Sequence, residues 1–216
     1  MIPRLWNTPA SDELTCAALP RDERLWTEMA SSARHTILSD IDPHDKGTGD
    51  LRIVVETPKG SRNKYDYDPD CDCLQLAKVL PEGMIFPYDF GFIPGTLGDD
   101  GDPLDVLVLM DAPVVPGCVI TARLVGAIEA EQKEKKADWI RNDRLIAVAT
   151  HAKTYETAKR LDDLRPHLMD EIREFFVDYN KLEGRKFEAK AEVGPGKAKG
   201  LIANGIRKFK DGRRKR

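Results

Sequence analysis

Five aspartates and no lysine or arginine fall within fourteen consecutive residues near the middle of the chain, residues 98–111. Four of these aspartates lie in residues 98–105, and the fifth follows an apolar run. Carboxylates held this close repel one another, so one of them must stay protonated unless a cation neutralises the group. Because all-oxygen sites suit hard divalent ions such as Mg²⁺, Mn²⁺ or Ca²⁺, the cluster predicts a metal site.

Two other interpretations of this segment have to be weighed. Asp, Gly and Pro also gather in solvated surface turns, which need no ligand. An EF-hand is excluded, because the sixth position is not Gly, Pro103 comes early and the segment leads into a β-rich run. The spacing favours a site, since Asp100, Asp102 and Asp105 are two and three residues apart around that proline. A turn that enters a strand can direct three such carboxylates into one pocket.

Short apolar runs separated by Gly, Pro and Asp predict the strands that position this turn. These runs cover residues 51–56, 106–110, 120–128 and 145–149. Several short strands with turn signals between them favour a small barrel over a doubly wound sheet. The sequence has neither a GxGxxG motif nor a Walker loop, so the usual glycine-rich phosphate cradles are absent.

The hydrophobic period then changes to that of a long helix, with one apolar position every three or four residues. The stripe consists of Leu161, Leu164, Leu168, Ile172, Phe175, Tyr179 and Leu182. Pro166 is expected in the first turn and Gly184 at the C-terminal cap. A second, weaker helix is expected around the apolar residues Leu201, Ile202, Ile206 and Phe209.

Composition limits the classes of protein to consider. The chain has 216 residues, with 34 Lys or Arg against 37 Asp or Glu, which gives no general field for binding nucleic acid. No apolar stretch is long enough to span a membrane, and the first residues do not have the pattern of a signal peptide. Cys71 and Cys73 are too close in sequence for an ordinary disulfide, so reduced thiols and a cytoplasmic location are expected.

The chain is expected to have three parts. Residues 1–50 form an N-terminal extension with a helical pattern near residues 21–34, and residues 51–196 form the main domain. Residues 197–216 form a C-terminal helix and basic tail with nine Lys or Arg and one Asp. We interpret this tail as a solubilising end in preference to a nucleic-acid contact, because Phe209 is its only aromatic residue.

Four collinear segments resemble those of the soluble family I inorganic pyrophosphatases. Residues 100–106, Asp-Gly-Asp-Pro-Leu-Asp-Val, resemble the family signature. Three further segments match in the same order: residues 56–66 (Glu-Thr-Pro-Lys-Gly-Ser-Arg-Asn-Lys-Tyr-Asp), 84–94 (Met-Ile-Phe-Pro-Tyr-Asp-Phe-Gly-Phe-Ile-Pro) and 175–184 (Phe-Phe-Val-Asp-Tyr-Asn-Lys-Leu-Glu-Gly). The resemblance covers about residues 51–190. It implies an α+β, mainly β fold with an OB-like five-stranded closed barrel and helices packed outside.

The resemblance also implies roles for individual residues. Asp100, Asp102 and Asp105 would bind metal, with Asp102 also acting as general base. Glu56 and Tyr179 would act in catalysis, Glu56 by organising metal or solvent and Tyr179 by donating its hydroxyl to a phosphate oxygen. The substrate would be bound by Lys64, Lys78, Arg144, Tyr179 and Lys181.

This sequence departs from the family pattern at several of its positions. Lys78 stands for an arginine, Asp66 for a glutamate, Phe86 and Phe90 for tyrosines, and Asn180 for a lysine. Asn142 falls at an expected aspartate and Arg144 at an expected lysine. Glu131 and Asp143 are therefore candidates for the missing metal carboxylates.

The resemblance implies hydrolysis of pyrophosphate to two phosphates by water activated on Mg²⁺, with Mn²⁺ as the alternative ion. It also implies a homo-oligomer. A metal-dependent hydrolase of another phosphate compound is one alternative, and a barrel that only binds a partner is another. Comparing the turnover of pyrophosphate with that of nucleotides distinguishes a pyrophosphatase from a hydrolase of another phosphate compound. Salt-dependent binding of nucleic acid without turnover would identify the binding barrel.

Overall fold

The computed structural model describes residue 38, residues 41–134 and residues 137–214. The strands are β1 Leu51–Thr57, β2 Asn63–Asp68, β3 Cys73–Val79, β4 Asp89–Ile93, β5 Leu104–Leu109, β6 Val119–Lys133, β7 Ile140–Arg141, β8 Arg144–Ala149 and β9 Lys186–Val193. The helices are the 3₁₀ turn η2 Leu161–Asp163 and the α-helices α2 Leu168–Leu182 and α3 Pro195–Arg214. The helix expected near residues 21–34 lies outside the described residues.

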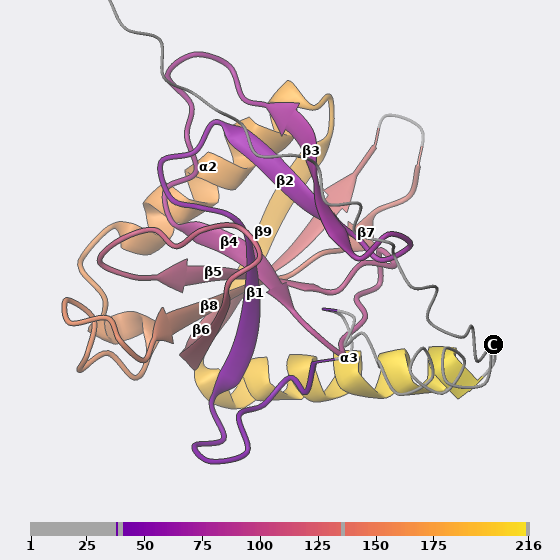
Figure 1. The fold of residues 1–216 in the computed structure, drawn as a ribbon. Coiled ribbons are helices and arrows are strands. Elements are labelled where there is room, and N and C mark those ends of the chain that lie inside the picture. The colour runs from indigo at the N-terminus through magenta and orange to yellow at the C-terminus, as the bar shows by residue number, and fades with distance from the viewer. Residues whose placement is uncertain (1–37, 39–40, 135–136, 215–216) are drawn as a thin grey trace, which may run out of the picture. The chain divides into compact units, whose positions relative to one another are not determined.

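Five strands are joined edge to edge in a ring of pairings. Strand β1 pairs with β4, β4 with β5, β5 with β8, β8 with β6, and β6 again with β1. Only the β5–β8 pair is parallel among these five. Strands β7 and β9 extend the long β6, whereas β2 and β3 form a separate hairpin. Figure 1 shows α2 and α3 on different sides of the strands, so the prediction of a mainly β fold with helices outside is confirmed.

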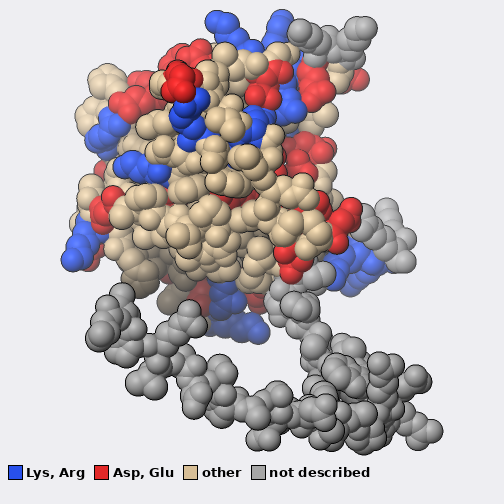
Figure 2. Space-filling model, turned by 45° about the horizontal axis from the view of Figure 1, so that its top comes forward, with Lys and Arg blue, Asp and Glu red and all other residues tan. Residues whose placement is uncertain are grey.

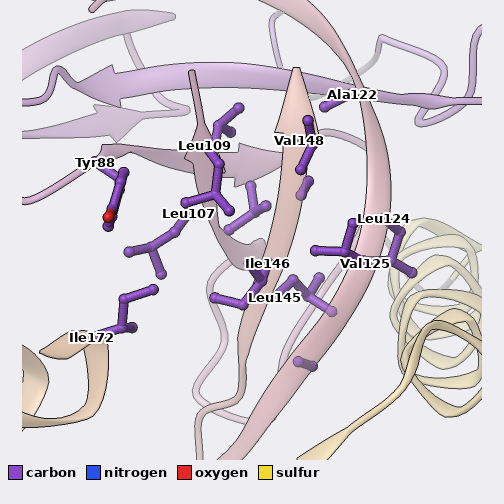
Figure 3. Packing of buried hydrophobic residues seen from close by; sticks show 14 of the residues in the cluster. Tyr88, Leu107, Leu109, Ala122, Leu124, Val125, Leu145, Ile146, Val148 and Ile172 are labelled. Carbon is purple, nitrogen blue, oxygen red and sulfur yellow. The ribbon is translucent and has the colours of Figure 1, made fainter. Parts of the chain in front are cut away.

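The core lies between the strands of the ring and helix α2. All six residues of β8 are buried, as are the last four of β5, and residues 145–149 and 106–109 are continuous apolar runs in the sequence. Figure 3 shows Leu107 and Leu109 of β5 beside Ile146 and Val148 of β8, with Ile172 of α2 on the side of Leu107. Burial of each such side chain stabilises the fold by about 1.5–3 kcal/mol.

Strand β4 passes close to β1 at Gly91. A Cβ atom built at this glycine would lie 2.0 Å from the carbonyl oxygen of Val54, so a larger residue requires the strands to separate. The two strands carry Phe90 and Glu56, and their close approach therefore fixes two of the candidate site residues relative to each other.

Helix α2 begins later than the apolar stripe predicted. Leu161 lies in the 3₁₀ turn, Leu164 is extended, and His167 takes a left-handed conformation with φ 63° before the helix begins at Leu168. Pro166 disfavours the helical conformation in the residue before it, which explains the break. The C-terminal prediction is confirmed: the helix ends at Leu182, and Gly184 has φ 70° and donates its N–H to the carbonyl of Lys181.

Helix α3 includes most of the basic C-terminal segment. It buries Ala198, Ile202 and Gly205, and the carbonyl of Gly205 accepts a hydrogen bond from the N–H of Leu97 at 3.1 Å. A Cβ atom at Gly205 would lie 2.7 Å from a methyl group of Leu104. The helix is thus docked against the loop that carries the acidic cluster.

The charges are mixed over the surface. Figure 2 shows Lys and Arg beside Asp and Glu around a broad uncharged area on the face in view. Within the described part of the chain, no helix is long and apolar enough to cross a membrane.

Candidate active site

A cavity of about 690 Å³ opens among strands β1, β2, β3, β5 and β8, helix α2 and the acidic loop. It brings together most of the site residues that the sequence predicts. Those that line it are Glu56, Lys64, Lys78, Asp100, Asp102, Asp105, Arg144 and Tyr179. Residues from positions 56 to 179 therefore meet at one place.

The acidic loop is folded so that three carboxylates share this cavity. Gly98 donates its N–H to the carbonyl of Asp102 at 2.7 Å, and the N–H of Asp102 lies 3.3 Å from Asp100 Oδ1. The N–H of Leu104 is held by the hydroxyl of Thr96 at 3.0 Å. Strand β5 then begins, and its second residue is Asp105.

The pKa values of all three carboxylates are raised. Burial and the nearby charge of Asp105 raise the pKa of Asp100 to about 6. Partial burial and the charge of Asp66 raise the pKa of Asp102, which is the most exposed of the three. Burial raises the pKa of Asp105 although the Arg144 guanidinium lowers it. A divalent cation in the cavity would relieve both the burial and the repulsion.

The donor chemistry fits a hard cation, although the carboxylates are not gathered into a finished coordination cluster. Among the described residues, no three His, Cys, Asp or Glu side chains come together as a group able to hold a metal. Arg144 stands beside Asp105, with Nη1 2.5 Å from Asp105 Oδ2. Binding of a cation by these oxygens therefore requires small side-chain shifts within the shared cavity.

Glu56 and Lys64 also line the cavity and form a buried pair. Lys64 Nζ lies 3.5 Å from Glu56 Oε2, contacts the carboxylate of Asp66, and donates to the carbonyl of Tyr65 at 2.7 Å. The N–H of Tyr67 donates to Glu56 Oε1 at 2.8 Å. Burial raises the pKa of Glu56 to about 7. Burial lowers the pKa of Lys64, but the charges of Glu56 and Asp66 raise it above its usual value, so Lys64 is a cation.

Arg144 is a buried cation with an unused donor. Its guanidinium contacts Asp105 and the Asn142 side-chain oxygen, and it lies over the rings of Phe176 and Phe187 at 4.9 and 5.7 Å. Its Nε atom is buried and has no hydrogen-bond partner. Buried donors are normally paired, so an oxygen of a bound ligand is the expected acceptor.

The aromatic departures from the family pattern form an apolar floor. Phe86 and Phe90 are buried with ring centroids 5.6 Å apart, and Lys64 Nζ lies 5.0 Å from the centre of the Phe90 ring. The ring of Tyr179 packs on Phe86 and lies 5.2 Å from Lys78 Nζ. Lys78 also pairs with Glu183 at 2.7 Å, which holds the lysine at the cavity wall.

Three predicted residues are not among those that line the cavity. Lys181 is exposed on α2, Glu131 pairs with Lys190 at 3.1 Å, and Asp143 accepts from the N–H of Ala130 and pairs with Arg141. Asn180 is buried and its amide donates to the helix carbonyl of Phe176. Neither Glu131 nor Asp143 lines this cavity, although Asp143 lines a smaller neighbouring pocket together with Asp100 and Asp105.

The structure adds cations that the sequence did not indicate. Arg185 and Arg213 line the cavity, and the charge of Arg185 lowers the pKa of Asp102. Arg185 Nε is anchored by Glu134 at 3.2 Å. The sequence signal that could have pointed to Arg185 is its position just after Gly184, where the chain turns from α2 into β9. Arg213 comes from the basic end of α3, which we had interpreted as a solubilising tail.

Comparison with known proteins gives a consistent result. The profile of the family described as inorganic pyrophosphatase matches residues 53–210. An inorganic pyrophosphatase from Synechocystis is 42% identical over 146 residues, which are 68% of this chain and 83% of that protein. Soluble inorganic pyrophosphatase 2 from Chlamydomonas reinhardtii is 33% identical, over 80% of this chain and 87% of that protein. The crystal structure of inorganic pyrophosphatase from Thermus thermophilus superposes with a TM-score of 0.73 at 33% identity, over 81% of this chain and 99% of that one.

Proposed function

The chain belongs to the inorganic pyrophosphatase family and hydrolyses inorganic pyrophosphate, and we propose that the cavity between the acidic loop and helix α2 is where it does so. The observation that carries this proposal is the meeting of six acidic side chains with five cationic ones around 690 Å³ of space. Pyrophosphate is a small polyanion, and its hydrolysis requires both kinds of group.

The carboxylates of Asp100, Asp102 and Asp105 would hold Mg²⁺, with Mn²⁺ as the alternative. Their raised pKa values and all-oxygen chemistry support a hard divalent ion. When bound, such an ion neutralises phosphate oxygens and makes water more acidic.

The cations of the cavity bind the phosphates. Lys64 and Lys78 supply point charges, and Arg144 offers its unpaired Nε donor to a phosphate oxygen. The hydroxyl of Tyr179 donates to a phosphate oxygen from the side of α2. Because Asn180 is neutral and engaged within its helix, Arg185 is the cation that replaces a lysine there.

Asp102 accepts the proton of the attacking water. A bond forms between the water oxygen and one phosphorus atom, the bridging P–O bond breaks, and the proton passes to the Asp102 carboxylate. Its raised pKa, caused first by burial, makes it a better base than an ordinary aspartate. Glu56, held by the N–H of Tyr67 and by Lys64, orders solvent in the cavity.

The test is phosphate release from pyrophosphate with Mg²⁺ present or chelated, beside release from nucleotides. Asp102→Asn should lose about 10²–10⁴-fold in turnover, which is the usual contribution of a general base. Asp99→Asn is the matched control, because Asp99 is in the same loop but pairs with Lys208 and does not line the cavity. Equal loss in both variants would assign the effect to the loop and remove Asp102 from the mechanism.

Further features of this chain are proposed with the site. The pairing of β1 with β6 supports an OB-like closed barrel of five strands. A homo-oligomer is consistent with exposed apolar side chains such as Leu76, Val79 and Leu182, and light scattering tests it. The chain is proposed to act in the cytoplasm, as one of its relatives is named a soluble enzyme.

A further inference from the structure

Two thiols face each other in the turn between β2 and β3. Cys71 Sγ and Cys73 Sγ are 2.9 Å apart, and both residues are exposed. Asp72 between them has φ 48°, a left-handed conformation that an aspartate tolerates. This backbone turn brings the two side chains together, although sequence spacing alone had indicated that they were too close for an ordinary disulfide.

The turn is continuous with the wall of the candidate active site. Pro69 and Asp70, just before Cys71, line the cavity, as does Tyr67. The Tyr67 hydroxyl donates to Asp72 Oδ1 at 2.8 Å, and the backbone N–H of Tyr67 donates to Glu56 Oε1 at 2.8 Å. One residue therefore links the carboxylate between the two cysteines to a carboxylate of the site.

We propose that Cys71 and Cys73 form a reversible disulfide, at the expense of a low-molecular-weight disulfide, and that its formation slows pyrophosphate hydrolysis. The slowing rests on the proposed function of the cavity, whereas formation of the bond does not. One cysteine thiolate attacks the small disulfide, forms a mixed disulfide and expels one small thiol. The second cysteine loses its proton to solvent, attacks the mixed disulfide and expels the second small thiol, so that two protein thiols are oxidised and one disulfide is reduced to two thiols.

The bond requires a short movement with a defined consequence. An S–S bond is 2.03–2.05 Å long, so the sulfur atoms have to approach by just under 1 Å. Because the closed ring contains the backbone of Asp72, its carboxylate moves relative to the Tyr67 hydroxyl. Loss of this hydrogen bond loosens the strand segment that holds Glu56. Disruption of such outer contacts lowers activity by about 10–100-fold in metal enzymes.

The surroundings of the thiols indicate which oxidant suits them. Asp68, Asp70 and Asp72 place negative charge around the turn, so a cationic disulfide approaches more readily than an anionic one. The hydrogen bond with Cys73 raises the pKa of Cys71, so its exchange is faster at mildly alkaline pH. Cystamine, a disulfide with two ammonium groups, is the probe chosen for these reasons.

The experiment uses the full chain with Cys16→Ser and Cys118→Ser, which leaves the two turn cysteines as its thiols. The protein is equilibrated in cystamine–cysteamine buffers, its free thiols are counted, and the cross-linked peptide is identified by mass spectrometry. We expect both thiols to disappear together, with a mass lower by two hydrogen atoms and no retained cysteamine. Pyrophosphate turnover should fall about tenfold in proportion to the oxidised fraction and recover on reduction.

The controls separate this inference from the proposed function. Full turnover by the reduced protein tests the cavity, and thiol chemistry tests the disulfide. A Cys71→Ser/Cys73→Ser variant should have the same turnover as the protein with both thiols reduced, and cystamine should not change it. Single cysteamine adducts as the final product, or a disulfide that leaves turnover unchanged, would each overturn the proposal.

Discussion

Replacement of Arg144 by methionine tests whether pairing with Asp105 outweighs the cost of burying the Arg144 guanidinium. The side chain of Arg144 is 5% exposed and that of its partner Asp105 is 22% exposed. Methionine keeps most of the apolar stem but removes the guanidinium from Asp105, Asn142 and the aromatic faces. Asp105 is then left at the cavity wall without its nearest cation.

The size of the effect follows from these contacts. Removal of one partner of a buried pair costs about 3–5 kcal/mol, and the partial exposure of Asp105 places this case at the lower end. Loss of the cation–π contact contributes up to about 1 kcal/mol, while protonation of Asp105, whose pKa is already raised, offsets part of the loss. We expect the free energy of unfolding to fall by about 3 kcal/mol and Tm by about 6–12 °C.

The measurement is urea unfolding and calorimetry in a chelator at pH 7.5, so that no divalent ion compensates for the missing guanidinium. Arg141→Met is the matched control, since Arg141 also pairs with two acids but is 43% exposed, and it should cost less than about 1 kcal/mol. Arg144→Lys keeps the charge and should recover part of the stability, but it lacks the Nε donor. In each folded variant, the KM for pyrophosphate reports the loss of the Nε donor.

A stability of Arg144→Met within 1 kcal/mol of wild type would refute this reasoning. It would mean that desolvation of the guanidinium offsets its pairing, as happens in other buried ion pairs. An unchanged KM in the same variant would remove Arg144 from the phosphate-binding groups.

Three further predictions concern other parts of the molecule. Gly91→Ala should destabilise the fold by about 1–3 kcal/mol in urea unfolding, because the new methyl group would meet a carbonyl oxygen of β1, whereas Gly200→Ala on α3 meets nothing within 4 Å and should be neutral or stabilising. Arg185→Ala should raise the KM for pyrophosphate about tenfold with little change in Tm. Lys186→Ala, at the exposed neighbouring position, should change neither quantity. Equal KM values for the two variants would mean that Arg185 does not contact the substrate. Hydrogen bonds from the Thr154 side chain and from the backbone N–H groups of Lys153 and Thr154 lower the pKa of Asp111 below 3.8. The contribution of Asp111 to stability is therefore present above that pH and is lost as the pH falls through the lower folded value. The difference in unfolding free energy between wild type and Asp111→Asn should therefore be full at pH 6 and narrow below pH 4, and a constant difference would contradict this account.

Several strands and the end of helix α2 can be predicted from short stretches of sequence, because they depend on the residue types within those stretches. The apolar runs at residues 106–110 and 145–149 predict buried strands that end at Leu109 and Ala149, because a strand covered on both faces carries apolar side chains on both. The glycine after α2 was identified as its cap because few other residues adopt a positive φ there. The helix start was missed, since the same apolar stripe continues through Pro166 into a non-helical turn. The strands β2, β3 and β9 give little periodic signal, because β2 is polar and mostly half-buried, and β3 and β9 are largely exposed.

Some residues of the site can also be predicted from the sequence, whereas others cannot. The acidic loop was recognisable because its carboxylates are neighbours in sequence, and Glu56, Lys64 and Tyr179 because they belong to matching segments. The sequence could not place Glu131 and Asp143 outside the cavity, because their neighbours Lys190 and Arg141 are set by the pairing of β6 with β9 and β7. The sequence also could not predict that Arg185 lines the cavity.

By itself, then, the sequence determined the type of chemistry: a turn of aspartates at fixed spacing, four cationic positions and the order of strands before helix. Only the tertiary structure decided which charges meet, that Arg144 is buried against Asp105 and that the thiols of Cys71 and Cys73 face each other. The reason is physical. Side-chain type and short spacing are covalent properties of the chain, whereas the distance between groups tens of residues apart depends on strand register and helix docking. Those are set by burial of the whole core.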